Sequence, residues 1–403
     1  MSAEAGGTEA AAERPLTVLT RMRARRRDEP NRASTPLELF FDLSFAAAVA
    51  QAGQQLVHAL VAGEPGHGIT GYLLIFFSIW WAWINFSWFA SAYDTDDVPY
   101  RVATLVQITG VLVLAAGVPR AFGHGDYRVA VSGYLIMRVA LTLQWLRAAH
   151  GETGQARAAA LIYAAGLVVV QGGWVALVLL PGSAWVTGVG PLIVAELAVP
   201  AIAERVHPTS WHPGHISDRY GAFTIIVLGE SISAATVAVQ SALDRQTDLS
   251  ELLPIALGGL VIVFGAFWIY FAVPVELHAR SDRQAFLWGY GHYLIFGSAA
   301  AIGAGLEVAT EQVTGAAHIS ALAAALAVTV PTALFSIAVW LVHIRPFKHD
   351  LSQQLVFPAT AVLVLAASFA GHWAVPVAGL VAAAGLAVSI ALAARTRRRT
   401  MVP

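Results

Sequence analysis

The sequence contains no cysteine and only one lysine, Lys348, among its 403 residues. The lack of cysteine excludes disulfides, thiolate metal sites and cysteine nucleophiles. The single lysine argues against a lysine-based phosphate site, and the HExxH, GxSxG and P-loop signatures of common enzymes are missing. We therefore expect no enzyme active site and no cofactor, and we expect no nucleic acid among the partners.

Charge is also scarce. Charged residues make up only 12% of the chain and hydrophobic residues 57%, whereas soluble domains are about 25% charged. This composition predicts an all-α polytopic membrane protein whose first partner is the lipid bilayer. Because a spanning helix needs about 20 mostly apolar residues, we count about twelve transmembrane helices, with ten or eleven possible where boundaries are soft. The runs are 37–60, 68–92, 101–119, 128–148, 158–180, 185–204, 219–241, 252–275, 288–308, 318–343, 353–371 and 373–394.

The basic residues lie mainly on one side of this predicted topology. With twelve spans, both ends and every second loop share a side, and that side holds all but four of the 24 Lys and Arg residues. Basic loops are normally cytoplasmic, so we expect both termini in the cytoplasm. Residues 1–34 are then a disordered basic tail and residues 396–403 a second basic tail.

An internal repeat is suggested by an offset of 185 residues. This shift places "WINFSWFASAYDTD", from Trp83, over "WIYFAVPVELHARSD", from Trp268, and Gln107 over His292. It predicts two six-helix halves, 35–205 and 206–395, with the same orientation in the membrane. Sites are then expected where the halves meet, and His292 becomes a site candidate.

Two carboxylates, Glu38 and Asp42, open the first apolar run, "TPLELFFDLSFAAAVAQ". Thr35, Pro36 and Glu38 fit a helix-start capping box, which explains Glu38 at the membrane surface. Asp42 lies about 10 Å into the helix at about 1.5 Å per residue, so capping does not explain it. It is either a functional group, one half of a buried pair with Arg138, or a hydrogen-bond acceptor.

Three further ionisable residues fall inside apolar runs, namely Arg138, Glu196 and Glu230. Such groups are costly at membrane depth and are functional candidates by default. Because an unpaired buried guanidinium would be costly, we predict that Arg138 lies within about 4 Å of at least one of Asp42, Glu196 or Glu230. Glu230, with Ser231 and Ser233 beside it, suits a cation or proton site or a pair with Arg138. Glu196 precedes Pro200 by four residues, so the helix backbone is broken there, either for an ion or only as a kink. Gly229 would let a neighbouring backbone approach closely.

Three histidines, His207, His212 and His215, lie between two apolar runs. Their spacing matches no strong zinc-ligand pattern. We therefore predict no metal site.

Two stretches together resemble the bacterial low temperature requirement protein A (LtrA) family, "PLELFFDLSFAAAVAQ" and "HISDRYGAFTIIVLGESI". The likeness covers about residues 33–395 and departs from the family pattern at Asp218, where Glu is usual. It implies a multi-pass protein of the bacterial inner membrane, and the family name refers to growth in the cold, not to a mechanism. The matched positions are Glu38, Phe40, Phe41, Asp42, Phe45, Arg219, Tyr220, Gly221, Gly229 and Glu230.

A weaker likeness links the first stretch to the Arg-x-x-x-Phe-Ser-Asp signature of a potassium-channel family with two six-helix repeats. Pro36 stands where that signature has Arg, and Phe41 where it has Ser. The likeness therefore implies a shared architecture more than a shared activity.

Together these features predict transport of a small solute or ion, with proton coupling as one option and with Asp42 and Glu230 central. We expect a polar cavity that joins Asp42, Glu230 and Arg138. The alternatives are a channel-like cation pathway, or a non-transporting membrane protein that senses or adapts lipid order in the cold. The second alternative predicts that the same residues are fully paired and dry.

Overall fold

The computed structural model describes residues 18–30, 32–180, 182–245, 248–272, 282–347 and 350–401. Within these ranges the chain forms helices and loops and no strand, so the all-α prediction is confirmed. The helices are α1 (Pro36–Val61), α2 (Pro65–Tyr93), α3 (Val98–His124), α4 (Arg128–Gly151), α5 (Gly154–Leu179), α6 (Gly182–Val206), α7 (Pro213–Asp244), α8 (Leu249–Phe271), α9 (Asp282–Val313), α10 (Ala321–Val339), α11 (Leu351–Ala366) and α12 (Ala374–Met401). A π-helical turn, η2 (Trp340–Ile344), extends α10, and a 3-10 segment, η4 (Ala367–Trp373), joins α11 to α12.

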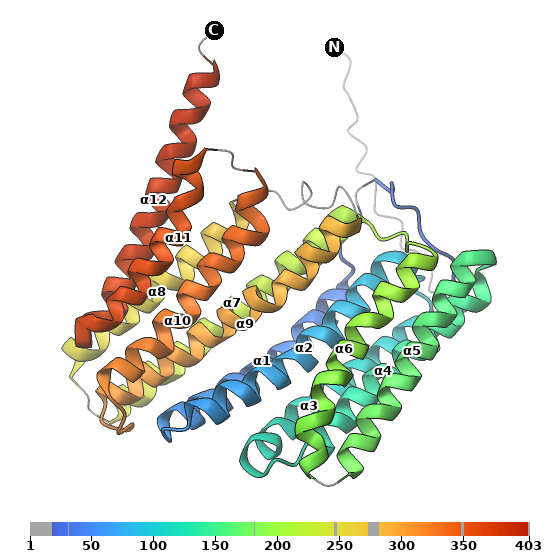
Figure 1. The fold of residues 1–403 in the computed structure, drawn as a ribbon, viewed down its shortest axis with the longest axis horizontal. Helices are drawn as coiled ribbons and strands as arrows, with labels where there is room; N and C mark the ends of the chain where they lie inside the picture. The colour runs from blue at the N-terminus through green and yellow to red at the C-terminus, as the bar shows by residue number, and fades with distance from the viewer. Residues whose placement is uncertain are drawn as a thin grey trace, which may run out of the picture.

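The helices form two groups that meet along α1. Figure 1 shows α1–α6 on one side of the molecule and α7–α12 on the other. Helix α1 packs against α2 and α3 of its own group and against α7 and α9 of the other. The residues at the start of α1 and of α7 therefore face the junction between the groups.

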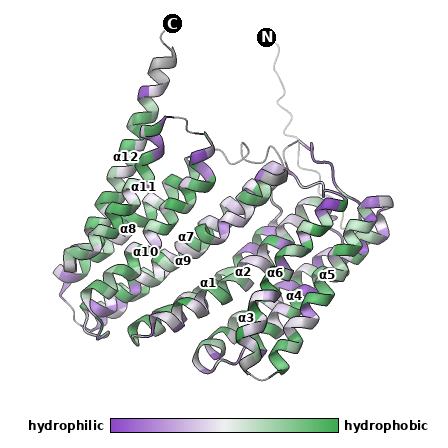
Figure 2. Ribbon diagram, in the orientation of Figure 1, coloured by the Kyte–Doolittle hydropathy of each residue, from purple (hydrophilic) through white to green (hydrophobic). Residues whose placement is uncertain are grey.

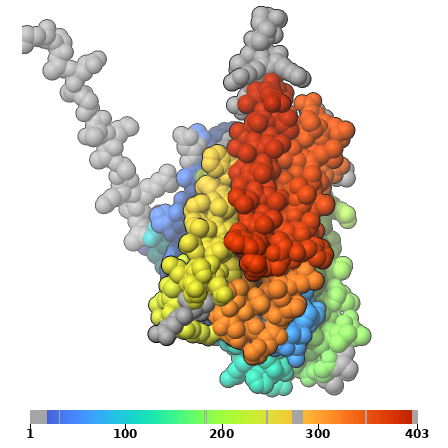
Figure 3. All heavy atoms as spheres, turned by 90° about the vertical axis from the view of Figure 1, so that its left-hand side faces the viewer, coloured from blue at the N-terminus to red at the C-terminus, as the bar shows by residue number. Residues whose placement is uncertain are grey.

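The last four helices of each group pack in the same order. In the first group α3 packs on α4, α4 on α5 and α5 on α6; in the second, α9 packs on α10, α10 on α11 and α11 on α12. Glycine allows the closest of these contacts: a Cβ on Gly133 would lie 2.2 Å from the backbone nitrogen of Leu114, and one on Gly305 would lie 2.1 Å from the carbonyl oxygen of Ala327. Such close helix pairs are typical of membrane bundles. Helices α12 and α8 cover the outer face of the second group, as Figure 3 shows.

Ten helical segments among the described residues are long and apolar enough to cross a membrane. Helix α1 is not among them, and α11, η4 and α12 count as one segment of 46 residues. Figure 2 shows that hydrophobic residues cover the flanks of the helices, while hydrophilic residues gather toward their ends. These features establish a membrane protein, and the exact number of spans remains a prediction.

The segment before α1 does not match the disordered tail that we expected up to residue 34. Residues 18–30 and 32–34, called here the N-terminal strap, lie against helix ends of both groups. The backbone nitrogen of Arg25 donates to Ala92 at 2.8 Å, and a side-chain nitrogen of His212 lies 2.9 Å from the carbonyl oxygen of Glu29. Arg25 also pairs with Asp94 at 3.4 Å. Burial raises the pKa of the Asp94 carboxyl to about 6 despite this pairing.

Candidate functional site

The two family stretches meet at the junction of the helix groups and form a buried ionic cluster. Helix α1 supplies Glu38 and Asp42, and α7 supplies His215 and Arg219; all four side chains are completely buried. We call these four residues the motif cluster. The Arg219 guanidinium donates to both carboxylate oxygens of Asp42, at 2.8 and 2.5 Å, and lies 3.4 Å from Glu38. A bidentate arginine–carboxylate pair of this kind is among the stronger polar contacts in proteins.

The two helix starts set the geometry of this cluster. Thr35 caps α1, and the predicted capping box with Glu38 is confirmed. His212 caps α7 through its ring nitrogen, which accepts from the backbone of His215, and Pro213 begins the helix. Residues four apart lie on one helix face, so the acids of α1 and the bases of α7 face each other as two stacked pairs. Glu38 lies 3.1 Å from the His215 ring.

Two expectations about this region were wrong. Asp42 does not pair with Arg138. Arg219, in the second turn of α7, lies next to Asp42 and donates to its carboxylate instead. Glu38 does not lie in water at the membrane surface, because the strap and α7 cover the start of α1 and leave its side chain fully buried. The cap therefore explains only part of the role of Glu38.

Aromatic rings enclose the cluster and exclude water from it. The indole nitrogen of Trp83 donates to Asp42 at 2.7 Å. Phe41 and Phe45 from the first stretch are fully buried, and Tyr220 from the second packs edge-on against Trp83 at 4.8 Å. Gly221 leaves room for Phe271. Phe40 points outward, at 52% exposure, as do Leu39 and Leu43 of the same stretch.

A second buried cluster lies inside the first helix group, around Glu196 of α6. Arg138 lies 3.8 Å from Glu196 and bonds to the Tyr134 hydroxyl, which donates to Glu196 at 2.9 Å. Trp81 and Trp174 donate to the same carboxylate at 2.9 and 3.2 Å. The prediction that Arg138 pairs with Asp42, Glu196 or Glu230 is confirmed, with Glu196 as the partner.

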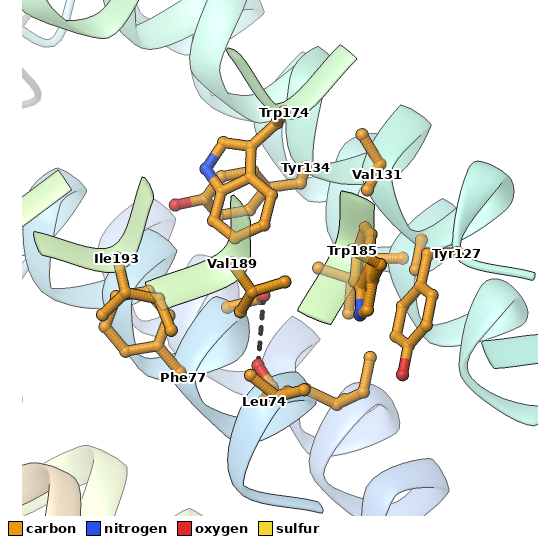
Figure 4. A pocket seen from close by; sticks show the side chains of 13 residues that line it. Leu74, Phe77, Tyr127, Val131, Tyr134, Trp174, Trp185, Val189 and Ile193 are labelled. Atoms are coloured by element: carbon orange, nitrogen blue, oxygen red, sulfur yellow. Dashed lines mark hydrogen bonds between the residues drawn. The ribbon is translucent and has the colours of Figure 1, made fainter. Parts of the chain in front are cut away.

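Figure 4 shows a small pocket beside this second cluster. Tyr134 and Trp174, two of the donors to Glu196, lie on its wall, and Trp185 stacks on Tyr127 across from them at 4.1 Å. Its volume is about 40 Å³ and most of its lining is apolar. The hydrogen bond drawn in the figure runs from Ser78 to the carbonyl of Leu74 at 3.3 Å. Arg138 and Glu196 do not line this pocket, and both side chains are buried.

Glu230 lies apart from both clusters, in a polar cavity between α1, α7 and α9. The cavity has a volume of about 150 Å³, and Glu230 shares its wall with a second carboxylate, Glu307 of α9, and with Gln54 of α1. We call it the carboxylate cavity. Its walls come from both helix groups, as expected for a site at their junction. Neither Asp42 nor Arg138 lines it, so the predicted cavity that joins all three residues is not present in the described structure.

The small residues beside Glu230 differ in their roles. Ser231 and Ser233 both line the carboxylate cavity, and the buried Ser231 hydroxyl lies 2.9 Å from the carbonyl oxygen of Ala299. A Cβ added to Gly229 would have no atom within 4 Å, so the close helix contact that we expected at Gly229 is not found. Helix packing depends instead on Gly303, where a Cβ would lie 2.7 Å from the Ser231 backbone.

His292 lies in a third location, buried between α8, α9 and η2. Its Nδ1 is 2.7 Å from the carbonyl oxygen of Trp288, so that nitrogen carries a proton. Its Nε2 is 3.0 Å from the Tyr270 hydroxyl and 3.2 Å from Nε2 of His343. It does not line the carboxylate cavity.

Sequence reasoning missed Glu307, and it named His215 and Arg219 without recognising them as the partners of Glu38 and Asp42. Glu307 falls at the end of the apolar run 288–308 and could have been recognised as an acid at membrane depth. His215 and Arg219 repeat the four-residue spacing of Glu38 and Asp42, which is the sequence signal for the two stacked pairs.

Comparisons with known proteins agree with the two stretches that form the motif cluster. The model of the family described as bacterial low temperature requirement A protein (LtrA) matches residues 33–393. The chain is also similar to an uncharacterized protein of Rhizobium meliloti (strain 1021), with 27% identity over 287 residues that cover 67% of each chain. The family match spans nearly all of the chain, including every residue of the motif cluster and both carboxylates of the cavity. The chain therefore belongs to the bacterial low temperature requirement A family.

Proposed function

We propose that this protein moves a small cation across the membrane through the carboxylate cavity. The observation that supports this most is the pair of acids, Glu230 and Glu307, on the wall of one cavity between the helix groups. Carboxylate, hydroxyl and amide oxygens are the groups that bind protons and hard cations. Asp42 is reassigned from the transport site to the joint between the groups, because Arg219 holds it.

The same proposal includes twelve spans in two six-helix repeats, in the inner membrane and with both termini in the cytoplasm. The order of neighbours that α3–α6 shares with α9–α12 supports the repeat. Each group also has a buried polar pair between its third and fourth helices: Gln107 and Gln144 bond at 3.0 Å between α3 and α4, and His292 lies 3.2 Å from His343 between α9 and the end of α10. The offset of 185 residues aligns Gln107 with His292.

Transport can be tested in sealed vesicles that contain the purified protein. Under an imposed proton, sodium or potassium gradient, an internal pH dye or a cation-sensitive dye reports flux. We expect Glu230→Gln and Glu307→Gln each to reduce flux at least about tenfold, equivalent to about 1.4 kcal/mol. Glu311→Gln is the matched control, since it lies one turn beyond Glu307 on α9 and does not line the cavity.

Two results would contradict this proposal. One is wild-type flux no greater than that of empty vesicles for all three cations. The other is normal flux in both cavity variants while Glu311→Gln lowers it.

A second candidate is the non-transporting protein that adapts to lipid order in the cold. It is favoured by the pairing of Asp42 with Arg219 and of Arg138 with Glu196, because all four side chains are buried. This function predicts that Glu230→Gln leaves growth in the cold unchanged, whereas the transport proposal predicts that growth is lost. We propose no enzymatic activity in either case.

A further inference from the structure

A second hollow, larger than the carboxylate cavity, is an apolar cleft lined by other residues of α9. It has a volume of about 730 Å³ and lies between the α1–α2 turn of one helix group and α9–α10 of the other. Its walls include Ile69, Leu73 and Leu294, which are 49%, 46% and 43% exposed. We call it the apolar cleft.

The two tyrosine hydroxyls of the cleft already have partners within the protein. The Tyr72 hydroxyl of α2 donates to the carbonyl of Gly297 on α9 at 2.7 Å. In return, the Tyr293 hydroxyl of α9 donates to the carbonyl of Leu73 on α2 at 2.8 Å. These two reciprocal bonds join the helix groups at the floor of the cleft. No ordered water is needed to satisfy them.

The contents of the cleft follow from its size and lining. Apolar cavities stay dry because water finds no hydrogen-bond partners in them. An empty space of about 730 Å³ would cost stability in proportion to its volume. The surrounding solvent at this depth is hydrocarbon, and lipid tails are as apolar as leucine. Hydrocarbon is therefore the filling that the cleft favours.

The shape of the cleft identifies which part of a lipid enters. Along α10 its wall runs from Ser320, at the helix start, to Leu334, a rise of about 21 Å at about 1.5 Å per residue. One leaflet of the hydrocarbon core is about 15 Å thick, half of about 30 Å. The cleft thus begins at a helix end, where His318 is exposed, and reaches through one leaflet.

We propose that the apolar cleft binds an acyl chain of a bilayer phospholipid, with the headgroup at the level of His318 and Ser320. The lipid lies in the leaflet that faces the α1–α2 turn. Its acyl chain lies between the two helix groups, next to the Tyr72 and Tyr293 hydrogen bonds. This inference does not depend on whether the protein transports a cation.

Photocrosslinking in vesicles tests this site. The protein is reconstituted in phosphatidylcholine that carries a diazirine on one acyl chain, irradiated, digested and analysed by mass spectrometry. We expect adducts to concentrate on the cleft walls, in residues 65–76, 293–301 and 318–334. Ala323→Trp should fill the cleft and reduce these adducts several-fold, because Ala323 lines it. Leu322→Trp is the matched control, since Leu322 is 41% exposed, is the next residue on α10 and does not line the cleft.

Several outcomes would overturn the proposal. Adducts spread along all exposed helices in proportion to exposure would indicate annular lipid only. Unchanged adducts in Ala323→Trp would place the chain elsewhere. Crosslinks between copies of the protein through α2 and α10 would show that a second copy covers the cleft. Preferential labelling by a trace of diazirine fatty acid over excess phospholipid would assign the site to a free fatty acid. Folding of each variant is checked by its elution as a single species in detergent.

Discussion

Arg219→Met should be the most destabilising single substitution in the motif cluster. It leaves the completely buried carboxylates of Asp42 and Glu38 with Thr35, His215 and Trp83 as hydrogen-bond partners but without a guanidinium. Loss of one partner from a buried ion pair costs about 3–5 kcal/mol, and here the lost guanidinium contacts both acids. Asp42→Asn should cost less, about 1–3 kcal/mol, because Arg219 keeps Glu38 at 3.4 Å and an amide oxygen can still accept from Trp83.

A double variant, Asp42→Asn with Arg219→Met, measures how much of the stability comes from the contact between these two residues. If Asp42 and Arg219 stabilise the fold mainly through each other, the combined cost should fall below the sum of the single costs by about 0.5–3 kcal/mol. The free energy of unfolding can be measured by titrating SDS into mixed micelles and following tryptophan fluorescence. Arg245→Met, on the exposed end of α7, serves as the control and should stay within about 0.5 kcal/mol of the wild type.

This reasoning fails if Arg219→Met unfolds within about 1 kcal/mol of the wild type, since a buried unpaired carboxylate costs more than that. It also fails if the free-energy cost of the double variant equals the sum of the costs of the two single variants. Either result would mean that water reaches the cluster and screens the charges.

Three further changes have defined outcomes. Gly151→Ala should release the N-terminal strap, because its Cβ would lie 1.6 Å from the carbonyl oxygen of Met22, and trypsin should then cut the strap faster than in Gly123→Ala, which has open space. In the wild type, the free energy of unfolding should fall as the pH rises from 3.8 to about 6, because the raised pKa of Asp94 means that the folded protein holds this proton more tightly than the unfolded chain. Asp94→Asn should abolish this fall, and thermal unfolding in detergent across that pH range measures the difference. Glu38→Gln should cost more than the cap alone, about 1 kcal/mol, because it also weakens the contacts with α7; a cost of 1 kcal/mol or less in the SDS titration would restrict Glu38 to capping.

The helical class and the start of α1 could be predicted from the sequence because both depend on local patterns. Apolar runs of membrane length identify helices whatever surrounds them. The Thr35–Glu38 box acts within one turn, so it needs no knowledge of the fold. The partner of Arg138 was narrowed to three acids for a similar reason, since few charged groups lie at that depth to balance it.

The motif cluster could not be assembled from hydropathy alone. Hydropathy starts the seventh run at Arg219, whereas the cap at His212 starts α7 at Pro213. Arg219 therefore lies in the second turn of α7 and is not its first residue, and from there its side chain contacts Asp42. Distances between helices depend on the packing of the whole bundle, so sequence reasoning offered Arg138 as the ionic partner of Asp42 and did not consider Arg219.

The contacts between the helix groups differ in kind from one end of the bundle to the other. Near the starts of α1 and α7, charged pairs and the strap tie the groups together, and these bonds are directional and buried. Further along, the hydrogen bonds of the Tyr72 and Tyr293 hydroxyls join α2 to α9. Beyond them the groups are separated by the carboxylate cavity and by the apolar cleft, which are lined by different residues of α9. Directional bonds resist displacement more than apolar contacts do. The buried pairs between α1 and α7 therefore fix how the two helix groups are joined more firmly than the contacts around the cavity and the cleft.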